Sequence, residues 1–209
     1  MDDSLDDLLQ RWRELTGTEH DAAGREVLSR WSEPHRRYHT VDHLRRILAA
    51  VDDLHEHADD VAAVRLAAWF HDAVYTGRSG PDERASALLA ASMLPGIGVP
   101  GPRVTEVVRL IELTVSHDPR PGDANGAVLC DADLAILGAP ADEYAAYAAA
   151  VRAEHPSVAD EDFRRGRAVV IRGLLALDPL YRTPTGQARW EAAARRNLTA
   201  ELSGLSAAT

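Results

Sequence analysis

Residues 61–74, VAAVRLAAWFHDAV, form the most apolar segment of the chain and determine the expected fold. Apolar side chains occupy most sides of this segment in a helical projection, which predicts a central buried helix. Amphipathic helical spacing continues through most of the remaining sequence. The other predicted helices are residues 5–15, 22–31, 41–54, 81–95, 104–115, 128–137, 144–154, 158–177 and 184–202. We therefore expect an all-α fold.

The composition narrows the possible chemistry. The length of 209 residues fits one domain or at most two small ones, and 45% hydrophobic and 27% charged residues are ordinary for a soluble globular protein. The helical pattern favours one helical domain over residues 1–209. All 23 basic residues are arginine, which excludes a lysine Schiff base and a P-loop lysine. The single cysteine, Cys130, excludes an intramolecular disulfide and a multi-cysteine zinc site. A net charge of −10 argues against a nucleic-acid polymer as partner.

The sequence also bears on location and association. The first seven residues are acidic where a signal peptide would be basic, and the longest apolar run, residues 144–151, is too short to span a bilayer. We expect a cytoplasmic protein with no membrane partner. The alanine-rich faces at residues 144–151 and 192–194 permit close helix packing, either within the domain or in a homodimer.

Three short segments place imidazoles and carboxylates beside apolar neighbours. They are YHTVDH at residues 38–43, WFHD at 69–72 and CDADL at 130–134. Buried polar groups need partners, and one metal ion could satisfy several of them at once. Histidine and carboxylate ligands without thiolate suit Mn, Fe, Co, Ni or Zn. The pattern alone equally allows a buried ion pair at His71 and Asp72, with Asp131 and Asp133 favouring a helix N-terminus.

In these segments the chain resembles the HD-domain superfamily of metal-dependent phosphohydrolases. That family carries the pattern His … His-Asp … Asp on a helical bundle, and the matching positions here are His43, His71-Asp72 and Asp133. Residues 33–43, 68–75, 131–138 and 194–198 are similar to small bacterial proteins described only as predicted HD-superfamily phosphohydrolases. The resemblance spans most of the chain. It implies a metal-site core at about residues 34–138, with helices from 140–205 packing on it.

The resemblance also implies roles for individual residues. His43, His71, Asp72 and Asp133 would hold a divalent ion such as Mn, Fe, Co, Ni, Zn or Mg. Asp133 is preferred to Asp131 because the ligand aspartate of related cyclic-nucleotide phosphodiesterases sits in a similar Ala-Asp-Leu context. Their Tyr-His-Asn-x-x-His element resembles residues 38–43, which implies that His39 is a proton donor. The expected catalytic residues are His39 and Asp72.

The expected reaction is hydrolysis of a phosphomonoester or phosphodiester of a small, nucleotide-like molecule by a hydroxide generated at the metal. The remaining candidates are Arg36, Arg37 and His117 for substrate binding and Asp42, Glu83 and Asp131 for orienting the metal ligands. The lone histidines His20, His55, His57 and His155 are interpreted as solvated helix residues. The main alternative is a nucleotide-binding regulatory module without turnover. An iron oxygenase is disfavoured because it needs more histidine ligands than this chain shows between His71 and Asp133.

Overall fold

The computed structural model describes residues 3–207, and every regular element in that range is a helix, which confirms the predicted all-α fold. Met1 and Asp2 of the acidic N-terminal segment lie outside the described residues. The helices are α1 (Asp3–Thr16), α2 (Asp21–Trp31), α3 (Val41–Leu54), α4 (Val61–Phe70), α5 (Pro81–Met93), α6 (Gly101–Leu113), α7 (Ala124–Asp133), α8 (Ala141–Ala153), α9 (Asp160–Ala176), α10 (Pro184–Gly186) and α11 (Ala192–Ala207). Short 3-10 turns join several of them, including η4 (Leu134–Gly138), and a π-helical turn, η5 (Gln187–Glu191), precedes α11.

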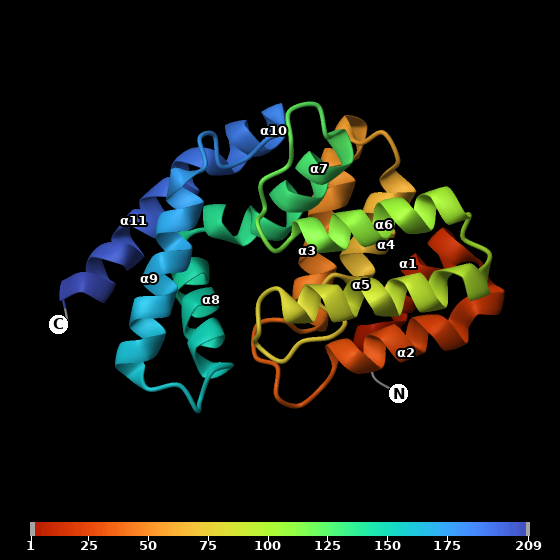
Figure 1. Ribbon diagram of the computed structural model, residues 1–209, viewed down its shortest axis with the longest axis horizontal. Coiled ribbons are helices and arrows are strands. Elements are labelled where there is room, and N and C mark those ends of the chain that lie inside the picture. The colour runs from red at the N-terminus through yellow and green to blue at the C-terminus, as the bar shows by residue number, and fades with distance from the viewer. Residues whose placement is uncertain (1–2, 208–209) are drawn as a thin grey trace.

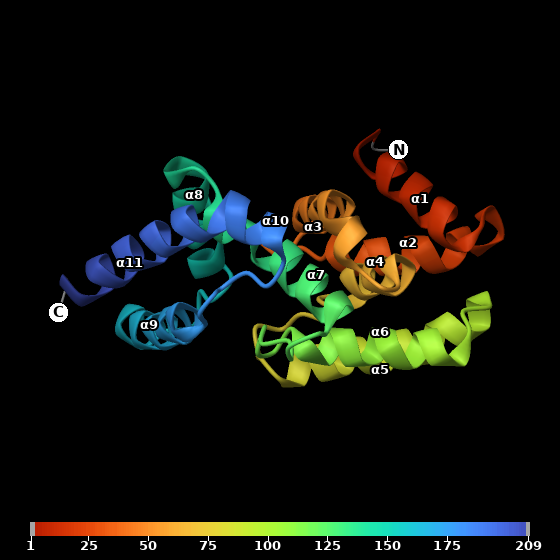
Figure 2. The ribbon, with the colours of Figure 1, turned by 90° about the horizontal axis from the view of Figure 1, so that it is seen from above.

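The helices form one compact domain with two groups of buried side chains. Figures 1 and 2 show α1 to α7 on one side of the molecule and α8, α9 and α11 on the other, connected through α7 and η4. In the first group α4 packs against α3, α5, α6 and α7, as its apolar sequence predicts. In the second group α9 and η4 pack against α11 around buried Ile171, Tyr181 and Leu198. The partly buried Trp190 packs against both groups.

Three buried tryptophans pack in the first group, and one of them lies against the candidate site. Trp12, Trp31 and Trp69 are fully buried, and the rings of Trp12 and Trp69 meet edge to face at 5.1 Å. The indole of Trp31 donates to the carbonyl oxygen of Trp69 at 2.9 Å, so its polar atom is satisfied inside the core. The Trp31 ring lies 5.4 Å from the imidazole of His71. The end of α4 therefore packs against buried aromatic rings.

The start of α3 and the end of α4 determine how the site is presented. Thr40 accepts a hydrogen bond from the backbone N–H of Asp42 and begins α3, as predicted. Helix α4 was predicted to run to Val74, but it ends at Phe70. The physical reason is that the N–H of Val74 bonds to the Ser86 hydroxyl instead of a carbonyl one turn back. His71 and Asp72 consequently lie at and just beyond the helix end.

Within residues 3–207, no helix combines the length and the apolarity needed to cross a membrane.

Candidate metal centre

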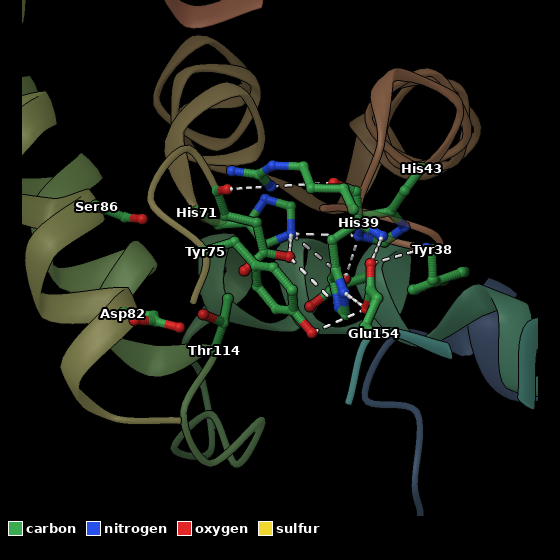
Figure 3. Close-up of polar contacts among 12 residues, drawn as sticks. Tyr38, His39, His43, His71, Tyr75, Asp82, Ser86, Thr114 and Glu154 are labelled. Atoms are coloured by element: carbon green, nitrogen blue, oxygen red, sulfur yellow. Dashed lines mark hydrogen bonds and ion pairs between the residues drawn. The ribbon is translucent and has the colours of Figure 1, made fainter. Parts of the chain in front are cut away.

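Three side chains from different helices converge at one buried point. His43 comes from the first turn of α3, His71 from the C-terminal cap of α4, and Asp133 from the last residue of α7. The two Nε2 atoms of His43 and His71 lie 3.3 Å apart. Oδ1 of Asp133 lies 3.1 Å from Nε2 of His43 and 3.6 Å from Nε2 of His71. Figure 3 shows the two imidazoles pointing toward each other. The sequence-predicted ligands are thus brought together.

The donor set fits a divalent cation. Nδ1 of His71 lies 2.9 Å from the carbonyl oxygen of Ala68, which can only accept, so Nδ1 carries a proton, and Nε2 offers a lone pair to a cation when the ring is neutral. Ligand atoms about 2.0–2.2 Å from one ion lie about 3.0–3.4 Å from each other, close to the separations between His43, His71 and Asp133. The side chains of the two histidines are 3% and 1% exposed. Buried groups of this kind are those that an ion can satisfy together.

Asp72 adds a second carboxylate beside His71. Its Oδ2 lies 3.2 Å from Nε2 of His71 and 3.8 Å from Nε2 of His39. Burial would raise the pKa of Asp72, but the two histidines outweigh it and lower the pKa. Burial would likewise lower the pKa of His71, but Asp72 and Asp133 raise it well above its ordinary value. The site therefore attracts positive charge.

His117 holds the other oxygen of Asp133. Its Nε2 lies 2.7 Å from Oδ2 of Asp133, while Oδ1 faces the two histidines. The backbone of His117 has a φ of 51°, a left-handed conformation that costs free energy for a residue with a side chain. His117 was predicted to bind substrate. The structure places its ring on a predicted metal ligand, where it orients the carboxylate.

A buried glutamate that the sequence did not indicate positions His39. The side chain of Glu154, just after α8, is 1% exposed. Its Oε2 lies 2.7 Å from Nδ1 of His39 and accepts from the hydroxyl of Tyr75 at 2.9 Å. Its Oε1 accepts from the backbone N–H groups of Arg37, Tyr38 and His39 at 2.7, 2.8 and 2.9 Å. Figure 3 shows Glu154 together with Tyr38, His39 and Tyr75.

The surroundings of His39 favour its protonated form. Burial would lower the pKa of His39, but Asp72 and Glu154 outweigh it and raise the pKa. The pKa of Glu154 is lowered to about 2, because its hydrogen bonds from His39 and the backbone outweigh burial. The ring of His39 stacks on Tyr75 at 4.2 Å. With Nδ1 held by Glu154, Nε2 of His39 is directed toward Asp72.

The prediction that Arg36 binds substrate does not fit its placement. Its guanidinium is fully enclosed, and all of its N–H groups are used. Nη1 donates to the carbonyls of His39 and Asp72, Nη2 to that of Ala73, and both Nε and Nη2 contact Glu33. Arg36 therefore joins the segment before α3 to the segment after α4. It supports the site and has no donor left for a phosphate.

Four other predicted site residues are placed as follows. Arg37 lies on the surface with its guanidinium on the carbonyls of Pro34 and Arg36, and Asp42 is exposed and paired with Arg45. Asp131 was predicted to orient the metal ligands, but its carboxylate accepts from the backbone N–H groups of Arg182 and Thr183 instead. Glu83 accepts from the N–H of Gly80 at the start of α5, and its side chain also lines the pocket described next.

A pocket of about 250 Å³ opens onto the centre, and His39, His71, Asp72, His117 and Asp133 all line it. His155, predicted to be a solvated helix residue, also lines this pocket. A larger pocket of about 410 Å³ lies elsewhere, on the segments around residues 119–127 and 179–184, and contains none of the candidate ligands. The smaller pocket is therefore the one that contains the candidate metal ligands. 

Comparisons with protein-family models, with curated proteins and with solved structures each returned no match to this chain. What the centre can do follows from its own geometry.

Proposed function

We propose that this protein is a metal-dependent phosphohydrolase that hydrolyses a small phosphate ester. The observation that carries the proposal is the convergence of His43, His71 and Asp133, whose ligand atoms all lie within 4.8 Å of one another, beside an open pocket. The resemblance of these segments to the HD superfamily points the same way. A structural ion pair would need one histidine and one carboxylate, and the second imidazole facing the first argues for a cation between them.

His43, His71 and Asp133 would hold the ion, with Asp72 as a further oxygen donor. A bound divalent ion supplies Lewis acidity toward a water molecule and toward a phosphoryl oxygen. The protein contributes orientation: His117 fixes the Asp133 carboxylate, and Ala68 fixes the His71 tautomer. These contacts prepare the ligands before substrate arrives.

His39 is suited to protonate the leaving group. In ester hydrolysis the oxygen of water bonds to phosphorus, the P–O bond of the ester breaks, and the departing alkoxide needs a proton. Protonated His39 can give it from Nε2, the nitrogen that faces Asp72, while Glu154 holds Nδ1. Burial would lower the pKa of His39, but Asp72 and Glu154 outweigh it and raise the pKa, which favours the protonated ring.

Elemental analysis of the purified protein tests the proposal, with His71→Ala beside it. His55→Ala is the matched control, because His55 is exposed and bonds only to the nearby carbonyl of Asp52. We expect near-stoichiometric transition metal in the wild type and in His55→Ala, and its loss in His71→Ala. A screen of phosphate esters with that metal should then give product.

If neither the wild type nor His55→Ala contains a divalent metal as purified, and neither binds one on titration, the hydrolase proposal fails. If metal and phosphate esters bind but no ester is cleaved, a non-catalytic nucleotide-binding module is the better description. Ligand-dependent thermal stabilisation would then be its signature.

A further inference from the structure

Two arginines line the pocket beside the candidate metal centre, and they differ in what their side chains already bind. Arg167 is buried, and all three of its nitrogens are engaged. Nε and Nη2 contact Glu201 at 2.8 and 3.0 Å, and Nη1 contacts the hydroxyl of Tyr147 at 3.2 Å. Arg167 therefore serves the packing of α9 against α11 and has little capacity for a ligand.

Arg78 lies in the segment between α4 and α5 and is exposed. Its Nε donates to the hydroxyl of Thr76 at 3.0 Å. Among the described residues, neither of its Nη atoms has a protein partner. An unpaired guanidinium fork on the wall of a pocket is suited to bind a phosphate in bidentate fashion.

The backbone that carries Arg78 is fixed by a buried carboxylate. Asp82 is 5% exposed and accepts from the N–H of Thr76 at 2.7 Å, from its hydroxyl at 2.8 Å, and from the N–H of Arg78 at 2.8 Å. Glu83 accepts from the N–H of Gly80. Asp82 and Glu83 thus accept hydrogen bonds from donors of residues 76–80, and the guanidinium of Arg78 is left to bind a ligand.

The same segment closes against the end of α8. Gly77 has a φ of +78°, and a Cβ at this position would lie 2.9 Å from Cε1 of His155. The imidazole of His155 lines the pocket, and within the described part of the chain its ring nitrogens have no hydrogen-bond partner. Arg78 and His155 therefore offer unused donors from two walls that touch at Gly77.

We propose that Arg78, with His155 beside it, binds the phosphate of the substrate. The inference rests on the proposed hydrolase function and narrows its substrate. A pocket of about 250 Å³ admits a small phosphate ester, whereas the pockets that bind drug-sized ligands measure about 300–1,000 Å³. The substrate class is a small phosphate ester that is anchored through its anionic group, with a compact organic part.

The test is binding of inorganic phosphate, measured by isothermal titration calorimetry on metal-analysed wild type, Arg78→Met, Arg78→Lys and Arg84→Met. Arg84 is the matched control because it is an exposed arginine on the first turn of α5, near Arg78, that does not line the pocket. We expect Arg78→Met to weaken phosphate binding about tenfold to hundredfold, as for loss of a charged hydrogen bond. Arg78→Lys should be intermediate because an ammonium lacks the fork.

Unchanged phosphate affinity in Arg78→Met, or an equal loss in Arg84→Met, overturns the inference. With an active enzyme, Arg78→Met should raise KM while kcat is largely kept, and a loss confined to kcat also overturns it. The metal content separates the two proposals. If the wild type holds no metal and shows no turnover, the hydrolase proposal is refuted. If phosphate binding is nevertheless weaker in Arg78→Met and not in Arg84→Met, the anion site is still supported.

Discussion

Nδ1 of His39 lies 2.7 Å from Oε2 of Glu154, and this contact joins two residues that are 115 positions apart in the chain. His39 precedes α3, on the side of the molecule that supplies the candidate metal ligands, whereas Glu154 follows α8 on the other side. The same carboxylate accepts from three backbone N–H groups of residues 37–39. Glu154, from the C-terminal part of the chain, therefore completes the site, since it holds His39, the residue that we propose as the proton donor.

Glu154→Gln should reduce turnover at least about tenfold without loss of metal. An amide cannot accept through both of its ends, so it either loses the backbone contacts or turns an N–H toward Nδ1 of His39, and the ring is no longer held in one tautomer. The measurement is kcat together with elemental analysis. Glu143→Gln, at an exposed glutamate on α8, the helix that Glu154 follows, is the control and should behave as wild type. Loss of metal in Glu154→Gln would contradict a role confined to His39.

The same carboxylate predicts how stability depends on pH. The pKa of Glu154 is lowered from 4.5 to about 2, because its hydrogen bonds outweigh burial. A lowered pKa in the folded state gives a stabilisation that is full above the unfolded pKa and is lost as the pH falls through the folded one. We expect the free energy of unfolding to fall more steeply in wild type than in Glu154→Gln between about pH 5 and pH 2. Urea titrations at several pH values measure this, and parallel curves would refute it.

The segments that carry the candidate metal ligands could be found from the sequence, because their signals are local. Thr40 is a helix N-cap by residue type, and His71-Asp72 interrupts the most apolar segment of the chain. The choice between Asp131 and Asp133 needed the resemblance, since both stand in the same short segment. In the structure Oδ1 of Asp133 faces the histidines, while Asp131 faces Thr183.

Glu154 and Arg36 could not be assigned from the sequence, because their roles depend on contacts between distant segments. Nothing near Glu154 marks a buried carboxylate, and its partners are the backbone of residues 37–39. Arg36 stands beside Arg37 and His39 and suggests a cationic patch. In the fold, however, its guanidinium donates to the carbonyls of Asp72 and Ala73, which lie just after the end of α4 and are distant from Arg36 in the sequence.

Arg36→Met should destabilise the protein by about 2–4 kcal/mol, because it removes the donor to the buried carbonyl of Ala73 and to the partly buried carbonyls of His39 and Asp72. Arg37→Met is the neighbouring control and should change the free energy of unfolding by less than about 0.5 kcal/mol, since Arg37 is exposed. Chemical denaturation of both variants measures the difference. Equal effects would show that the buried guanidinium does not hold the two segments together.

Asp133→Asn and Asp131→Asn should separate metal binding from folding. Asp133→Asn removes one charged ligand oxygen, so we expect metal affinity to fall by more than about tenfold. A fall of about tenfold is the smaller effect expected when only a residue that contacts a ligand is lost. Asp131 accepts from two backbone N–H groups and a hydroxyl around Thr183, so Asp131→Asn should cost about 1–3 kcal/mol of stability and keep the metal. Metal titration followed by urea unfolding of each variant gives both quantities. If Asp131→Asn loses the metal and Asp133→Asn retains it, the ligand is Asp131, and the contact between Asp133 and His43 is only an ion pair.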